Sequence, residues 1–307
     1  MEPVDALEEI AFLLERERAS TYRVEAFRTA AEALSEVGPD AVRRLHGAGA
    51  LRDVPGIGAR TAEVVAQALD DEVPDYLAEL RARAGGPLVA GGETVRAALR
   101  GDLHTHTDWS DGGSSLTTMV ATAERLGHEY LAVTDHSPRL KVANGLSADR
   151  LAEQLDVVAG LDTASIQVLT GIEVDILEDG SLDQSPALLR ILDVVVASVH
   201  SKLRMDRAAM TRRMLAAVED PATNVLGHCT GRLVEGSRGT RPQSTFDAER
   251  VFAACAAHDV AVEINARPER QDPPDDLIEL ALGAGCLFSI DSDAHAPGQL
   301  DFLDHGC

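Results

Sequence analysis

The sequence predicts an α/β protein, in which a seven-stranded barrel of βα units follows a small domain made only of helices. From residue 102 onward, seven short apolar runs alternate with amphipathic helical stretches, which indicates parallel βα units. Nearly every run ends in His, Asp, Glu or Asn, and such barrels carry their active sites at the carboxyl ends of the strands. An open doubly wound sheet fits the strand count equally well. Convergence of seven polar strand ends on one point favours a closed or nearly closed barrel.

The strand candidates are short and rich in apolar residues. They are DLHTH (102–106), YLAVTDH (130–136), IQVLTGIEVDI (166–176), DVVVASVH (193–200), NVLGH (224–228), VAVEIN (260–265) and CLFSIDSDAH (286–295). Their spacing leaves room for one helix between successive strands, as a parallel arrangement requires. We therefore assign 102–307 to the barrel.

The preceding segment has helical periodicity. Apolar residues recur at three- and four-residue spacings through 1–81, which predicts an all-helical domain. Residues 82–101, ARAGGPLVAGGETVRAALRG, are rich in Gly and Ala and are expected to form a linker with one short helix.

Composition narrows the possible locations and partners. The 307 residues carry a formal net charge of −23, and no apolar run reaches the length of a membrane span. The N-terminus is acidic and amphipathic, unlike a signal peptide, so a cytoplasmic location without membrane contact is expected. A strongly acidic chain is a poor general binder of nucleic-acid backbone. The four cysteines show no CxxC spacing and are expected to be free thiols.

The stretch GDLHTHTDWSDGG (101–113) begins the barrel with a concentration of possible metal ligands. His104 and His106 are two residues apart on a strand and therefore share one face. The other strand ends add further imidazoles and carboxylates, so that the full set is His104, His106, Asp111, His136, Glu173, His200, His228, Asp293 and His295. If these groups gathered at one end of the barrel without cations, the protonated imidazoles would repel one another. Their burial would also deprive the charged groups of solvation. Divalent cations resolve both problems.

The motifs HTHTDWSDG, TDHS, GIEVDI, SVHS, GHCTGR, EINARPER and SDAH resemble those of the polymerase and histidinol phosphatase (PHP) family in type, order and spacing. The resemblance covers residues 102–297 and implies a distorted, TIM-like seven-stranded barrel that holds a trinuclear metal centre. It is strongest to the PHP domain of bacterial X-family DNA polymerases. That branch usually has proline where this chain has Cys229, a thiol for which we expect no chemical role.

The resemblance also implies which residues share each metal ion. One ion would be bound by His104, His106, Glu173 and Asp293, a second by Glu173, His200 and His228, and a third by Asp111, His136 and His295. The six ligands of the first two ions are the expected catalytic residues, because paired cations can activate a bridging water. The mixed nitrogen and oxygen ligands suit Zn, Mn or Fe, and the sequence does not choose among them.

Several polar side chains near the strand ends are candidates for binding a phosphate. Four of them are cations and two are hydrogen-bonding groups: Arg232, Arg270, Lys202, Arg267, Ser137 and Asn265. Exposed loop charges are the alternative interpretation of the cations.

The N-terminal domain contains DVPGIGART (53–61), which has the form of a helix-hairpin-helix. Gly56 and Gly58 permit a tight turn, and the following helix would offer backbone N–H groups to a phosphate. The domain resembles the N-terminal domain of X-family polymerases. Residues 1–85 nevertheless hold 17 acidic side chains against 10 arginines and no lysine, so DNA contact and a structural or protein-docking role both remain open.

The sequence thus predicts a hydrolase of phosphoric ester bonds. Its substrate would be a nucleic acid or nucleotide, cleaved as by a 3′-to-5′ exonuclease or an end-processing enzyme. The resemblance implies no polymerase activity, because a linker of some 20 residues stands where palm and fingers domains would lie. One alternative is a small-metabolite phosphatase of the histidinol-phosphatase type, and another is a DNA-end or protein-binding module with structural metals. Of the remaining histidines, His46, His128 and His258 are expected at the surface.

Overall fold

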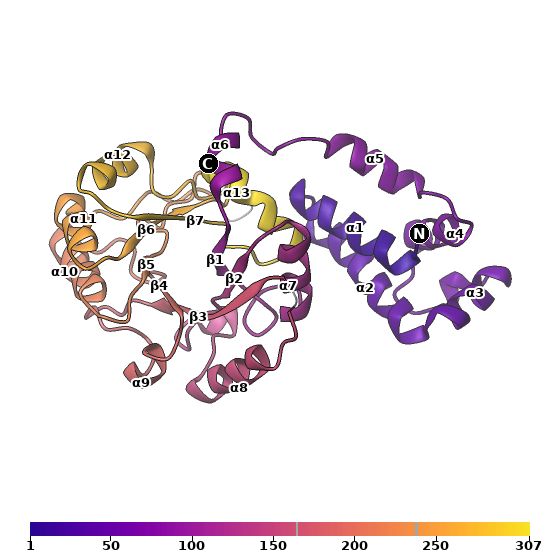
Figure 1. The fold of residues 1–307 in the computed structure, drawn as a ribbon, viewed down its shortest axis with the longest axis horizontal. Coiled ribbons are helices and arrows are strands. Elements are labelled where there is room, and N and C mark those ends of the chain that lie inside the picture. The colour runs from indigo at the N-terminus through magenta and orange to yellow at the C-terminus, as the bar shows by residue number, and fades with distance from the viewer. Residues whose placement is uncertain (164, 237–238) are drawn as a thin grey trace. The chain divides into compact units, whose positions relative to one another are not determined.

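The computed structural model describes residues 1–163, 165–236 and 239–307. The chain divides into two compact units, Met1–Pro87 and Leu88–Cys307 (Figure 1). None of the helices in these described ranges is long and apolar enough to cross a membrane.

The first unit consists of helices, as predicted. They are α1 (Pro3–Arg16), α2 (Thr21–Val37), α3 (Pro39–Gly47), the 3₁₀ turn η1 (Leu51–Asp53), α4 (Ala59–Leu69) and α5 (Asp75–Arg83). The apolar stripe of α1, including Leu7, Ile10 and Leu14, is fully buried against the other helices. Packing of such stripes, rather than helix propensity, stabilises helices of this length.

The second unit is built on seven parallel strands in sequence order. They are β1 (Gly101–Thr105), β2 (Tyr130–Val133), β3 (Gln167–Asp175), β4 (Val194–Ser198), β5 (Val225–Leu226), β6 (Ala261–Asn265) and β7 (Phe288–Asp291). Every neighbouring pair is parallel, and β3 pairs with β2 through Gln167–Thr170 and with β4 through Gly171–Asp175. All seven predicted strands are present, and several end earlier than the apolar runs suggest.

Helices separate the strands and cover the outside of the barrel (Figure 1). They are α6 (Glu93–Ala98), α7 (Leu116–Arg125), η2 (Lys141–Ala143), α8 (Ala148–Ala159), α9 (Pro186–Leu189), α10 (Arg207–Val218), α11 (Ala248–Ala257), α12 (Asp275–Gly283), η3 (Pro297–Phe302) and α13 (Leu303–Gly306). The largest core cluster packs α10 and α11 onto β3–β6 and includes Ile172, Val195, Met214 and Phe252.

The barrel nearly closes between β1 and the chain that follows β7. Thr105 forms a parallel bridge with Ala294, and the backbone N–H of His106 donates to the Ala294 carbonyl at 2.8 Å. Earlier in β1, a side chain takes the place of a backbone acceptor on β7: Asp291 Oδ1 accepts the N–H of Leu103 at 2.9 Å. The closure holds the ends of β1 and β7 side by side, and both ends carry polar residues of the predicted centre.

Candidate metal centre

The structure places all nine predicted ligands at the carboxyl-terminal mouth of the barrel. Only His104 and Glu173 lie within strands, on β1 and β3. The other seven follow β1, β2, β4, β5 and β7 by one to six residues: His106, Asp111, His136, His200, His228, Asp293 and His295. Strands therefore fix the floor of the centre, whereas short loops supply most of its side chains.

Glu173 occupies the middle of the centre and is 1% exposed. Its Oε1 lies 2.8 Å from Nε2 of His228 and 3.1 Å from Nε2 of His200. Its Oε2 faces Nδ1 of His136 at 2.7 Å, Nε2 of His104 at 3.5 Å and Nε2 of His106 at 3.7 Å. One carboxylate thus faces imidazoles from two sides, which suits a group that bridges two cations.

Two aspartates complete the ring of acceptors. Asp293 Oδ1 lies 3.3 Å from Nε2 of His106. Asp111 Oδ1 lies 3.4 Å from Nε2 of both His136 and His295. The side chain of Asp111 is 37% exposed, so the centre is open to solvent on this side.

The donor atoms form three groups that fit metal sites. In each group the possible ligand atoms lie within 4.8 Å of one another; the groups are His104–His106–Asp293, His136–Glu173–His200 and His106–Asp111–His136–His295. In this arrangement His136 accompanies Glu173 and His200, whereas the family resemblance implies His228 there.

Buried nitrogens without hydrogen bonds support the fit to cations. Nε2 of His104, both ring nitrogens of His106 and His200, and Nδ1 of His228 make no hydrogen bond, and each is shielded from solvent. Buried polar atoms are normally satisfied, and the unsatisfied Nε2 atoms of His104, His106 and His200 also face the Glu173 carboxylate, so they indicate sites for metal ions.

The electrostatics of the centre give its members different protonation states. Burial disfavours the charged form of every group, but His200, His104 and His136 outweigh it and hold the pKa of Glu173 well below its usual range. Burial opposes the charged form of His200 as well, yet Glu173 and Asp175 raise its pKa to about 9. Burial and the adjacent His136 lower the pKa of His106 to about 3. Cations must displace a proton from groups such as His200, so binding should weaken in acid.

Three of the imidazoles have neighbours outside the ring of proposed ligands. Nδ1 of His104 lies 2.5 Å from Oε1 of Glu263, a fully buried carboxylate on β6. Nδ1 of His200 lies 3.6 Å from Asp175 Oδ1. In His295, Nδ1 lies 2.9 Å from Nη1 of Arg267, which can only donate, and 2.9 Å from the backbone carbonyl of Asp293. In His104, a proton held at Nδ1 by Glu263 leaves the Nε2 lone pair directed into the centre, which is the tautomer a metal ligand needs.

Another buried acid shapes the loop after β1. Asp135 accepts hydrogen bonds from the N–H of Thr107 at 2.9 Å and the hydroxyl of Thr107 at 2.7 Å, and also from Ser110 and Gln154. This network folds 107–110 back toward β2 and so brings Asp111 to His136. Sequence reasoning missed Asp135, Asp175 and Glu263 as site residues. Glu263 could have been found, since it shares a strand face with Asn265.

The predicted phosphate-binding residues occupy different environments. Arg270 Nε lies 3.2 Å from Asp293 Oδ2, and Arg267 donates to the Asp293 carbonyl at 3.0 Å. Arg232 donates from Nε to the carbonyls of Arg270 and Gln271, at 3.2 and 2.6 Å.

The remaining three candidates divide into one exposed cation and two buried groups. Lys202 is exposed on the loop after β4. Ser137 is buried, and its hydroxyl accepts the N–H of Asp175 at 2.9 Å. Asn265 donates to Glu263 and Asp293 at 3.2 and 3.1 Å. Both buried groups are therefore engaged in supporting the centre.

In the N-terminal unit, the predicted hairpin joins η1 to α4. Gly56 has φ +90°, and a Cβ there would lie 2.9 Å from Thr29 Cγ2. Gly58 caps α4, and its N–H donates to Thr61 Oγ1 at 2.9 Å. Both glycines are exposed.

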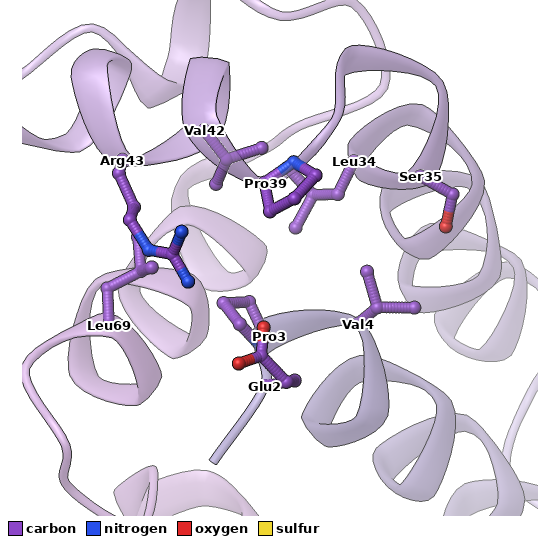
Figure 2. A pocket seen from close by; sticks show the side chains of 9 residues that line it. All are labelled: Glu2, Pro3, Val4, Leu34, Ser35, Pro39, Val42, Arg43 and Leu69. Carbon is purple, nitrogen blue, oxygen red and sulfur yellow. The ribbon is translucent and has the colours of Figure 1, made fainter.

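A separate pocket of about 260 Å³ lies between the ends of α1, α2, α3 and α4 in this unit (Figure 2). Its lining is mostly apolar: Glu2, Pro3, Val4, Leu34, Ser35, Pro39, Val42, Arg43 and Leu69. It includes neither hairpin glycine, so it is distinct from the predicted phosphate-binding turn.

One histidine outside the centre differs from its prediction. His128, expected at the surface, is only 5% exposed, and neither ring nitrogen makes a hydrogen bond. It lies at the start of the run that leads into β2, directly after the turn that ends α7.

A βα barrel whose mouth gathers imidazoles and carboxylates into three groups that could each hold a cation is typical of metal-binding proteins, many of them hydrolases. Comparison with known proteins identifies the family within that class. Residues 102–267 match the PHP domain, and residues 1–73 match a helix-hairpin-helix domain. The chain therefore belongs to the PHP domain family.

Relatives are found among both polymerases and phosphatases. DNA polymerase/3′-5′ exonuclease PolX of Bacillus subtilis (strain 168) is 35% identical over 210 residues, which cover 68% of this chain and 36% of PolX. The match thus spans about a third of the length of that relative. "Probable phosphatase YcdX" of Escherichia coli (strain K12) is 29% identical over 205 residues, covering 63% of this chain and 78% of the relative.

Among solved structures, histidinol phosphate phosphatase of Lactococcus lactis is 18% identical. The superposition has a TM-score of 0.46 and covers 64% of this chain and 87% of that protein.

Proposed function

We propose that this protein removes nucleotides from the 3′ end of a nucleic acid by hydrolysing phosphodiester bonds at a centre of three divalent cations, Zn, Mn or Fe. The observation that carries this proposal is the convergence of nine potential ligands from the strand ends around Glu173, with buried ring nitrogens that lack hydrogen bonds. A purely structural polar layer would satisfy those nitrogens within the protein.

The proposed ligands are the nine residues at the barrel mouth. When bound there, divalent cations supply Lewis acidity and lower the pKa of a coordinated water. Glu263 orients the ring of His104 and Asp175 holds the backbone of His200, while we assign Arg232 and Lys202 the attraction of the phosphate. Arg267 and Arg270 offset the charge of Asp293 beside the substrate.

Nucleic acid is the favoured substrate because a helix-hairpin-helix domain and a PHP domain occur in one chain, and because PolX is named as a polymerase and 3′-5′ exonuclease. In this proposal, residues 1–81 form a docking domain that uses the turn at Gly56 and Gly58, and 102–307 form the hydrolase. In this proposal the turn offers backbone N–H groups at the start of α4 to a phosphate. Such groups can bind an anion even though the charged side chains of this domain are mostly acidic.

The test uses the full chain loaded with Mn²⁺ and a single-stranded oligonucleotide labelled at its 5′ end. We expect a ladder of products shortened from the 3′ end, and no shortening when the 3′-terminal linkages are phosphorothioates. His104→Ala should abolish the ladder, whereas His258→Ala, a change at an exposed position, should leave it unchanged. A wild-type protein that holds its full complement of Mn²⁺ but leaves the oligonucleotide intact contradicts the proposal.

A phosphatase for small metabolites is the second candidate. The net charge of −23 favours it, since a small phosphate ester needs no extended cationic track. The match to the E. coli relative covers 78% of that protein, which is named a probable phosphatase. Release of inorganic phosphate from histidinol phosphate or other monoesters, without shortening of the oligonucleotide, would support this candidate.

A further inference from the structure

A buried arginine lies behind two loops of the centre. Arg213, on α10, is 1% exposed. Its guanidinium has five N–H groups, and the structure provides five contacts for them: Nε and Nη2 to the Ile176 carbonyl, Nη1 to the Ser201 carbonyl and Met205 Sδ, and Nη2 to Ser201 Oγ. The donors are thus fully used, by neutral acceptors.

The two carbonyls belong to the chain segments that carry proposed ligands. Ile176 is the first residue after β3 and lies three residues beyond Glu173, while Ser201 directly follows His200. The Nε of Arg213 lies 2.9 Å from the Ile176 carbonyl, and Nη1 lies 2.8 Å from the Ser201 carbonyl. One planar group therefore holds both segments at a fixed separation.

The same segments are linked on the side of the centre. Asp175 Oδ1 accepts the backbone N–H of His200 at 3.2 Å and faces its Nδ1 at 3.6 Å. Arg213 lies close enough to Asp175 to interact with its charge, although the guanidinium forms no ion pair with any carboxylate in the described ranges. The segments that follow β3 and β4 are thus joined by Arg213 on the side away from the centre and by Asp175 on the side of the centre.

Stability alone does not explain why an arginine occupies this position. A cation that is removed from water and paired only with neutral acceptors loses solvation that a Met or Leu of similar length would not lose. An apolar side chain would in turn leave the Ile176 and Ser201 carbonyls without these donors. A need to fix two carbonyls at one separation explains the arginine, because its rigid fork of donors does this and an apolar side chain does not.

We propose that Arg213 is a positioning residue of the metal centre, which sets the distance between the ends of β3 and β4 so that Glu173 and His200 share one cation. This inference rests on the proposed function only in requiring that the centre binds metal. It assigns Arg213 no contact with substrate, and it predicts that the cation between Glu173 and His200 depends on a side chain outside the centre.

The test compares Arg213→Met and Arg213→Lys with matched changes at Arg212, which is the exposed neighbour on α10. Mn²⁺ binding is measured by titration calorimetry, and thermal unfolding is measured with and without Mn²⁺. For Arg213→Met we expect about 10- to 100-fold weaker binding of one equivalent of Mn²⁺, as is found when outer partners of metal ligands are removed. The stabilisation by Mn²⁺ should shrink accordingly, while Arg212→Met and Arg212→Lys behave as wild type.

Arg213→Lys decides the case if the Met variant does not fold, because Lys keeps the charge but offers a single compact group in place of the fork. Weakened Mn²⁺ binding in this variant supports the proposal. Wild-type Mn²⁺ binding in a folded Arg213 variant overturns it, as does an equal loss of stability with and without Mn²⁺. Normal Mn²⁺ binding by the wild type without hydrolysis of any ester would contradict the proposed function and leave this inference standing.

Discussion

His104 and Glu263 form a buried pair in which Nδ1 of the imidazole lies 2.5 Å from Oε1 of the carboxylate. Both side chains are fully buried, on β1 and β6. The other oxygen, Oε2, accepts the backbone N–H of His228 and, at 3.2 Å, the amide of Asn265. Glu263 therefore joins β1, the β5 loop and β6 beneath the centre, and it leaves the Nε2 lone pair of His104 available.

Glu263→Gln should weaken metal binding without unfolding the protein. An amide N–H₂ group must then face either the Nδ1–H of His104 or the two donors at Oε2, and each orientation opposes donor to donor. We expect about 10- to 100-fold weaker Mn²⁺ binding by titration calorimetry. Glu279→Gln, an exposed change on α12, is the matched control. Equal affinity in both variants would show that Glu263 does not orient His104.

Arg232 offers a test of phosphate recognition. Its Nε is engaged by backbone carbonyls, which orients the rest of the guanidinium without neutralising it. A charge-assisted hydrogen bond to phosphate contributes about 1.5–3 kcal/mol, so Arg232→Ala should raise KM roughly 10- to 150-fold. Steady-state kinetics separate this from an effect on kcat. Arg190→Ala, an exposed change just after α9 and before β4, should alter neither constant. A fall in kcat with KM unchanged would argue against ground-state phosphate binding by Arg232.

Much of the centre was predictable because strand ends are visible in sequence. The runs that end in His, Glu, Asn or Asp indicate both the barrel and the edge where its polar residues meet. Exact strand ends were not predictable: β2 stops at Val133 and β7 at Asp291, because the chain leaves the ladder to turn His136 and Asp293 inward. Local apolar composition does not reveal where that departure begins.

The outer partners were harder to predict for a different reason. Asp135, Asp175 and Glu263 are carboxylates in apolar runs, and their roles depend on which residue of another strand each one faces. That pairing is set by sheet register, which composition and periodicity do not specify. Arg213 is a stronger example, since it belongs to a helix whose cations are otherwise mostly exposed.

The hairpin glycines should differ in their tolerance of a side chain. Gly56→Ala forces a positive φ on alanine and crowds Thr29, so it should destabilise the helical unit by about 1–2 kcal/mol or more. Gly58 has φ −90°, and a Cβ added there would meet no heavy atom within 4 Å, so Gly58→Ala should be nearly neutral. Circular dichroism follows helix melting, and Trp109, the only tryptophan, reports on the barrel. A Gly58→Ala variant less stable than Gly56→Ala would contradict this assignment.

His128 should make stability depend on pH independently of the metal centre. Burial, and then the charge of Arg96, lower the pKa of His128 to about 4. The unfolded chain therefore binds this proton more tightly than the folded chain, so the stability due to neutral His128 is complete above about pH 6.5 and is lost as pH falls toward 4. The loss reaches roughly 3 kcal/mol below pH 4. As the pH falls from about 6.5 to 4, the His128→Leu variant should therefore become progressively more stable relative to wild type. The measurement is the fall in Tm between pH 7.5 and pH 4, which should be smaller in the variant. For His258→Leu, a change at an exposed position, Tm should vary with pH as it does in wild type. If the Tm of His128→Leu also varies with pH as in wild type, the buried ring is not the source of the acid sensitivity.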